Sequence, residues 1–167
     1  MPDQLQRLIL SFGPMQIDME FKSALIQLCM EKAQSKVDRL NGMLEDLQQD
    51  SLSETKRTAG DKHETGRAML HLEREKLAGQ QTAAVADLTG LKAIDFEKVS
   101  NNVQPGSLIE TDRGLFLLAV SLGKIKLKDR EVVVLSPASP LGRLFINEQQ
   151  GSRISFRQLS YSILYIY

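Results

Sequence analysis

The segment FKSALIQLCMEKAQSKVDRLNGMLEDL, residues 21–47, decides the architecture of the first half of the chain. Its apolar or small side chains recur at steps of three and four residues, at Phe21, Leu25, Cys29, Ala33, Val37, Leu40, Leu44 and Leu47. Steps of this size place side chains on one stripe of an α-helix. The pattern therefore predicts a long amphipathic helix in this region.

A second, weaker periodic segment follows. Its apolar positions are Met69, Leu70, Leu72, Leu77, Ala84, Leu88 and Leu91. Two narrow apolar stripes are buried most economically against each other, which predicts an antiparallel coiled-coil hairpin with its turn near Asp50 to Gly60. The alternative is a pair of helices from an ordinary bundle.

The character of the chain changes after Leu91, where seven of its nine aromatic residues lie. Turn residues such as Asp112-Arg113-Gly114 and Gly123 separate short segments of strand-forming residues. The expected strands are residues 107–111, 115–121, 131–135, 153–156 and 161–166. We therefore expect an α+β protein with an N-terminal extension (1–18), a helical hairpin (19–98) and a small β-sheet domain (99–167).

One short helix is expected within the second half. In the segment from Ser139 to Ile146, Ser139 suits the N-cap position and Pro140 suits the first helical position. Serine at an N-cap accepts a backbone hydrogen bond, and proline lacks only an N–H that a first helical turn does not use. The predicted domain is thus a small sheet crossed by one helix.

Composition restricts the classes of function. With 21 basic and 21 acidic residues the formal net charge is zero, so there is no overall attraction to nucleic acid or to an anionic membrane. The single cysteine, Cys29, excludes an internal disulfide and a cysteine-rich zinc site, and we expect it to be a buried thiol. Apolar runs are far shorter than the roughly 20 residues that cross a bilayer, and no signal peptide is evident. We expect a soluble, cytoplasmic protein without a membrane partner.

The polar segment 51–67 is the strongest candidate for chemistry. His63 and His71 are eight residues apart and do not share a helical face at metal-ligand spacing, and neither a hydrolase triad nor a phosphate-binding glycine loop is present. Asp61 and Glu64 are three residues apart, so both carboxylates lie on one face if a helix begins near Asp61. Such a pair could complete a Mg²⁺ site only with ligands from another molecule, and the alternative is a solvated loop.

Four motifs resemble a known family. Gly60-Asp61-Lys62-His63-Glu64-Thr65 resembles the G-D-x-x-E-N motif at the hairpin tip of the bacterial Gre transcript-cleavage factors. Downstream, Pro105-Gly106-Ser107-Leu108-Ile109, Ser136-Pro137-Ala138-Ser139-Pro140-Leu141-Gly142 and Tyr161-Ser162-Ile163-Leu164-Tyr165-Ile166 resemble the entry strand, a loop before a short helix, and the closing strand of that family's C-terminal domain. The resemblance covers roughly residues 20–167.

The resemblance implies a coiled-coil hairpin joined to an FKBP-like domain, and a partner, RNA polymerase. It implies that the domain docks through Ser139 and Pro140 and that the hairpin enters the secondary channel of the polymerase. There Asp61 and Glu64 would help to hold the second catalytic Mg²⁺, which activates water to hydrolyse backtracked RNA at the 3′ end of the transcript. Such a protein is a cofactor of the polymerase and not itself an enzyme.

The chain departs from the family pattern at two places. Thr65-Gly66-Arg67-Ala68 stands where the family has Asn-Ala-Glu-Tyr, and Ala138 stands where many relatives have Asp or Asn. These departures leave open a regulator that occupies the channel without promoting cleavage. A prolyl isomerase-like chaperone and an unrelated coiled-coil adaptor are the remaining alternatives.

Overall fold

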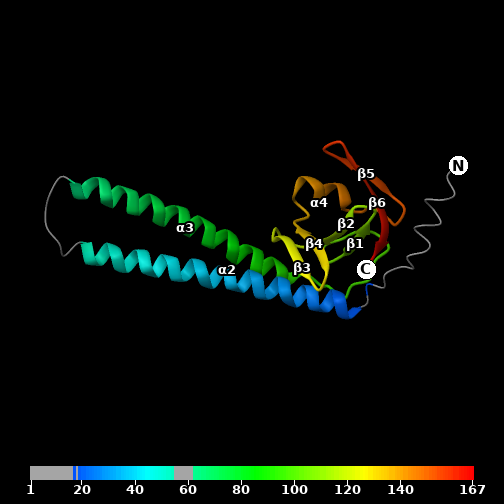
Figure 1. Cartoon of the computed structure of the whole chain (residues 1–167), viewed down its shortest axis with the longest axis horizontal. Helices are drawn as coiled ribbons and strands as arrows, with labels where there is room; N and C mark the ends of the chain where they lie inside the picture. Colours follow the sequence, from blue (N-terminus) through cyan, green and yellow to red (C-terminus); the bar gives the residue numbers. More distant parts are fainter. Residues whose placement is uncertain (1–16, 18, 55–61) are drawn as a thin grey trace.

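Two long helices come first in the structure, a computed structural model that describes residue 17, residues 19–54 and residues 62–167. They are α2 (Met19–Glu54, 36 residues) and α3 (Lys62–Ala93, 32 residues). The helices lie side by side, run in opposite directions and extend away from the part that holds the strands (Figure 1). The sequence predicts the turn near Asp50 to Gly60, and α2 continues through the first half of this range, to Glu54.

The predicted apolar stripe of α2 is confirmed as a buried face. Its side chains are buried at Phe21, Leu25, Cys29, Ala33, Val37 and Leu40, and half-buried at Leu44 and Leu47. Polar contacts border this face, because Gln81 Nε2 of α3 donates to Asn41 Oδ1 at 2.8 Å and Lys36 Nζ lies 3.9 Å from Asp87 Oδ2. Apolar burial and polar contacts together hold α2 against α3.

The buried face of α3 differs from the predicted one at two positions. It consists of Leu77, Ala84, Leu88 and Leu91, and Leu70 is half-buried. Met69 and Leu72, which the sequence assigns to the stripe, are 67% and 65% exposed, so that assignment is wrong. Leu72 and Met69 lie five and eight residues before Leu77, which turns them about 140° and about 80° around the helix, both in the same direction. Neither side chain can therefore point towards α2 when Leu77 does.

The second half of the chain forms one six-stranded sheet. The strands are β1 (Leu108–Thr111), β2 (Gly114–Leu118), β3 (Gly123–Leu127), β4 (Arg130–Leu135), β5 (Arg153–Phe156) and β6 (Leu159–Ile166). Their order across the sheet is β3-β4-β2-β1-β6-β5, and only β2 and β4 pair in parallel. The short helix α4 (Pro140–Phe145) precedes β5. The described part of the chain is thus α+β, as the sequence predicts.

Strand β3 is missing from the five strands that the sequence predicts. It has the sequence GKIKL, pairs only with β4 at one edge of the sheet, and buries Ile125 alone. Lysines on the outer face of an edge strand protect it against pairing with another chain, but they leave too little apolar alternation to mark a strand. Gly123 does make the expected turn, with φ +71, and β3 begins at that same residue.

The two faces of the sheet carry separate apolar cores. On one face the first turns of α2 and the end of α3 pack against Leu108, Leu117 and Val132. On the other face, Phe145 of α4 is fully buried, and its ring centroid lies 5.2 Å from that of Phe116. The sheet is therefore covered by the base of the helix pair on one side and by α4 on the other.

Two contacts attach the first turn of α2 to the sheet. Lys22, only 5% exposed, donates from Nζ to the backbone oxygen of Tyr167 at 3.0 Å. Burial lowers the pKa of Lys22, and the carboxylate of Asp95 partly opposes this effect. The guanidinium of Arg130 lies 5.3 Å from the centroid of the Phe21 ring, within range of a cation-π interaction. These contacts fix the base of α2 beside β4 and the end of β6.

Candidate functional site

Glu64 lies in the first turn of α3, at the end of the helix pair farthest from the sheet (Figure 1). Its side chain is exposed. Asp61, the other member of the predicted carboxylate pair, lies outside the described residues, so the pairing of the two carboxylates stays a prediction. Within the part of the chain that the structure describes, no group of three or more His, Cys, Asp or Glu could hold a metal ion.

A single exposed carboxylate has two physical roles available at this position. It stabilises α3 by about 0.3–1 kcal/mol, because the N-terminal end of a helix carries a partial positive charge. Its oxygens also suit Mg²⁺, which proteins commonly bind through one or two carboxylates while water and phosphate groups supply the other ligands. Glu64 alone can therefore supply one ligand to Mg²⁺, and a complete site would need further ligands from elsewhere.

The second candidate region is the loop that begins α4. Ser139 is the N-cap: its Oγ accepts a hydrogen bond from the backbone N–H of Gly142 at 3.0 Å and donates one to the backbone oxygen of Ser136 at 2.7 Å. Pro140 is the first helical residue. The predicted roles of Ser139 and Pro140 in starting the helix are confirmed.

Gly142 allows the loop to lie directly against the helix. A Cβ atom at this position would lie 2.1 Å from the backbone oxygen of Ser136 and 2.8 Å from Ser139 Oγ. Real Cβ atoms do not approach a backbone oxygen so closely, so the loop has its observed shape only with glycine here. The shape of the loop thus depends on Ser136, Ser139 and Gly142 together.

The loop presents a different set of residues to solvent. Ala138 and Pro140 are exposed, whereas the hydroxyl of Ser139 is occupied by its two hydrogen bonds within the loop. Leu144, one helical turn after Pro140, is 39% exposed and is a surface residue that the sequence analysis does not single out. Its spacing of four residues from Pro140 is the signal that could have identified it.

The two candidate regions lie at opposite ends of the molecule. Glu64 is at the far end of the helix pair, and α4 lies on the sheet (Figure 1). The structure therefore does not bring Glu64 together with Ser139 and Pro140. Any function that uses both regions requires a partner large enough to span the helix pair.

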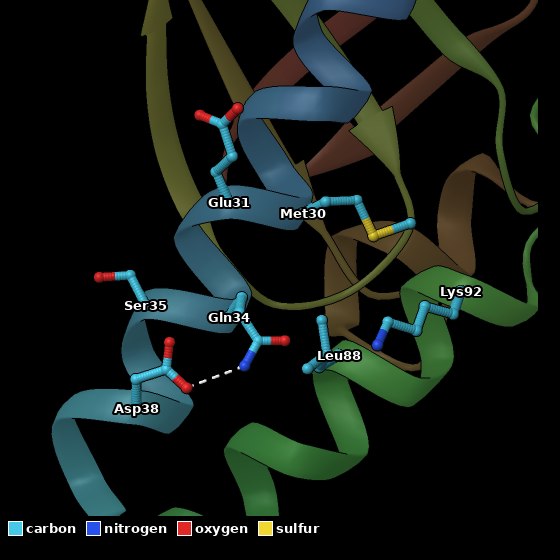
Figure 2. A pocket seen from close by; sticks show the side chains of 7 residues that line it. All are labelled: Met30, Glu31, Gln34, Ser35, Asp38, Leu88 and Lys92. Atoms are coloured by element: carbon cyan, nitrogen blue, oxygen red, sulfur yellow. Dashed lines mark hydrogen bonds between the residues drawn. The ribbon is translucent and has the colours of Figure 1, made fainter. Parts of the chain in front are cut away.

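A shallow pocket of about 450 Å³ lies between α2 and α3 (Figure 2). It is lined by Met30, Glu31, Gln34, Ser35, Asp38, Leu88 and Lys92. Gln34 Nε2 donates to Asp38 Oδ1 at 2.9 Å, and the side chains of Glu31 and Ser35 point away from Leu88 and Lys92 (Figure 2). Ligand sites usually have polar groups that converge on one point, and the polar groups here diverge. The pocket is a groove of the helix interface.

Among the described residues, neither Cys29 nor His71 belongs to a catalytic arrangement of side chains. Cys29 is fully buried, as predicted, and burial raises the pKa of its thiol to about 11 although Lys32 acts in the opposite direction. The thiol is therefore protonated at neutral pH and is a poor nucleophile. His71 is exposed on α3 and lies 3.8 Å from Glu75, one turn away, as an ordinary surface pair.

Comparison of the chain with family models, with curated proteins and with solved structures gave no match. Among the described residues, no helix combines the length and the apolar character needed to cross a bilayer. The two candidate regions and the sequence motifs that lie in them are accordingly the features that bear on function.

Proposed function

We propose that the chain is a transcription elongation factor that binds RNA polymerase and stimulates its cleavage of backtracked RNA. One observation carries the proposal: a long helix pair projects from an α+β part and ends near an exposed carboxylate, Glu64, in the sequence context Gly60 to Thr65 (Figure 1). The resemblance of this segment to the tip motif of the Gre factors supports the choice of partner. In this proposal the helix pair is an antiparallel coiled-coil hairpin and the sheet part is FKBP-like.

The length of the helices supports insertion into a deep channel. The 36 residues of α2 span about 54 Å at about 1.5 Å per residue. Such a helix pair can carry a carboxylate well beyond the surface on which the sheet part rests. The hairpin then enters the secondary channel, while the loop at Ser139 and Pro140 docks on the outside of the polymerase.

The proposed role of the tip is to supply ligands to a metal ion that the polymerase holds. Glu64 and Asp61 would provide carboxylate oxygens to Mg²⁺ near the 3′ end of the nascent RNA. Bound there, the ion supplies Lewis-acid activation of water for RNA hydrolysis. The chain's own contribution is the position and the negative charge of these two side chains, so it acts as a cofactor and not as an enzyme by itself.

The test uses stalled, backtracked elongation complexes incubated with Mg²⁺ and the protein. We expect short 3′ RNA fragments to be released, and we expect Asp61→Asn with Glu64→Gln to abolish release while binding to polymerase is retained. Glu73→Gln is the matched control, because Glu73 is an exposed glutamate of α3 two to three turns from Glu64. Release that persists in the double variant would contradict the role of the tip.

A second candidate function is favoured by Arg67. This exposed arginine lies one turn after Glu64, and a positive charge beside a carboxylate opposes the binding of a cation. The chain would then occupy the channel and regulate or inhibit the polymerase without promoting cleavage. Binding to polymerase without release of RNA fragments, and slower elongation in the presence of the protein, would identify this function.

A further inference from the structure

The outward face of α4 combines apolar and cationic side chains. Phe145 and Gly142 point into the molecule and are buried, whereas Pro140, Arg143 and Leu144 are exposed. Residues three and four positions apart are neighbours on a helix surface, so these three side chains form one face. Leu144 is 39% exposed, whereas the other large apolar residues of this short helix face the core: Phe145 is fully buried and Leu141 is half-buried.

The β5–β6 hairpin ends in a backbone conformation that its residues do not favour. Arg157 and Gln158 form the two-residue turn, with φ of 48° and 66°. A turn with both central residues in this region matches the twist of a hairpin but is strongly preferred by Asn and Gly. Side chains with a Cβ cost roughly 1–2 kcal/mol each in this conformation. The chain thus places an arginine where stability alone favours glycine.

Arg157 is also held in position. Its guanidinium lies 5.2 Å from the centroid of the Phe156 ring, and Phe156 packs on the core beneath α4. Stacking of this kind restricts the side chain while the polar edge of the guanidinium stays available. Leu159, the residue that follows the turn, is 44% exposed. The hairpin tip therefore repeats the combination found on α4, an arginine next to an exposed leucine.

These two elements are neighbours, because α4 lies beside β5 (Figure 1) and both cover the core that contains Phe145 and Ile154. We use the name α4–hairpin surface for Pro140, Arg143, Leu144, Arg157 and Leu159. Within the described part of the chain, neither Arg143 nor Arg157 forms an ion pair.

We propose that the α4–hairpin surface is a single docking surface for a protein partner that presents carboxylates beside apolar side chains. Acidic groups on a partner would complement the two guanidinium groups, which form no ion pair among the described residues, and an apolar contact would complement the exposed leucines and proline. A nucleic acid fits less well, because its affinity comes from many phosphate contacts and gains nothing from exposed leucines. The inference rests on the proposed function, since it takes RNA polymerase as the partner and extends the docking site from Ser139 and Pro140 to the hairpin tip.

The test measures the affinity of bacterial core RNA polymerase for the full chain and for Arg143→Glu/Arg157→Glu. We expect the double variant to bind about tenfold more weakly or worse, and Arg143→Gln/Arg157→Gln to lose less, because glutamine removes charge without creating repulsion. The control is Lys128→Glu, the same charge reversal in the exposed β3–β4 turn at the other edge of the sheet. Circular dichroism checks that each variant is folded.

The outcomes separate the two proposals. If the wild-type chain does not bind polymerase, the proposed function fails and this inference fails with it. If the wild-type chain binds polymerase and both folded double variants bind it as tightly as the wild type does, the α4–hairpin surface is refuted and the proposed function stands. If the double variants lose affinity for a duplex RNA probe but keep their affinity for polymerase, the inference is also overturned, because the arginines would then bind a nucleic acid.

Discussion

Replacement of Gly142 by alanine tests the view that the loop before α4 is held by direct contact with the helix. The new Cβ would lie 2.1 Å from the backbone oxygen of Ser136 and 3.0 Å from Leu135 Cδ1, so the loop must move. Loss of the Ser139 cap costs about 1 kcal/mol, and overpacking costs about 1–3 kcal/mol. The better helix propensity of alanine returns at most about 1 kcal/mol. We expect a net loss of about 2 kcal/mol in the free energy of unfolding.

Urea unfolding followed by circular dichroism measures this loss. With a slope near 2 kcal/mol per molar urea, the midpoint should fall by about 1 M. Gly79→Ala is the control, because nothing lies within 4 Å of a Cβ at Gly79 in the middle of α3. We expect this variant to gain up to about 1 kcal/mol, because alanine is the better helix former. A Gly142→Ala midpoint equal to that of the wild-type protein would refute the close-contact argument.

Three further predictions test the helix pair and its base. The pKa of the Cys29 thiol is raised from 9.0 to about 11 in the folded protein, so the thiol of the unfolded chain loses its proton first as pH rises through this interval. The free energy of unfolding should therefore fall by up to about 1.4 kcal/mol per pH unit between these values. In urea titrations, Cys29→Ala should show a shallower fall over the same pH range. Lys22→Met should raise the free energy of unfolding by about 1 kcal/mol at pH 7, because the variant removes a buried charge. The backbone oxygen of Tyr167 keeps the 2.9 Å hydrogen bond that it accepts from the backbone N–H of Leu108 in β1. A decrease of more than about 2 kcal/mol would contradict this prediction. Leu40→Asp should lower the free energy of unfolding of the helix pair by at least about 3 kcal/mol, because Leu40 is buried. Leu72→Asp should change it by less than about 0.5 kcal/mol in thermal unfolding, because Leu72 is 65% exposed. Equal effects of the two variants would be inconsistent with the observed burial.

Features that depend on neighbouring residues could be predicted from the sequence. The stripe of α2 follows from steps of three and four residues, and the start of α4 follows from a serine and a proline in adjacent positions. A capping hydrogen bond joins residues three apart, so the local sequence contains all that it requires. The hairpin at Asp112-Arg113 was predictable for the same reason, and Thr111 pairs with Gly114 across it.

Features that depend on the path of the chain could not be predicted in this way. Strand β3 is stabilised by its pairing with β4 rather than by an apolar pattern of its own. The contact between Lys22 and Tyr167 joins residues 145 positions apart, so it exists only because the sheet brings them together. At the candidate tip, the position of Asp61 stays a prediction. The position of Glu64 in the first turn of α3 could be predicted from the motif and from the helical period.

The order of the strands has a consequence for synthesis of the chain on the ribosome. The hairpins β1–β2 and β3–β4 join neighbouring segments and can form as soon as these segments emerge. Strand β1, however, lies between β2 and β6, and β6 is made after the five other strands of this sheet. A nascent chain that stops before Leu159 therefore exposes the unpaired N–H and C=O groups of β1, and this edge should recruit chaperones or neighbouring chains until β6 covers it.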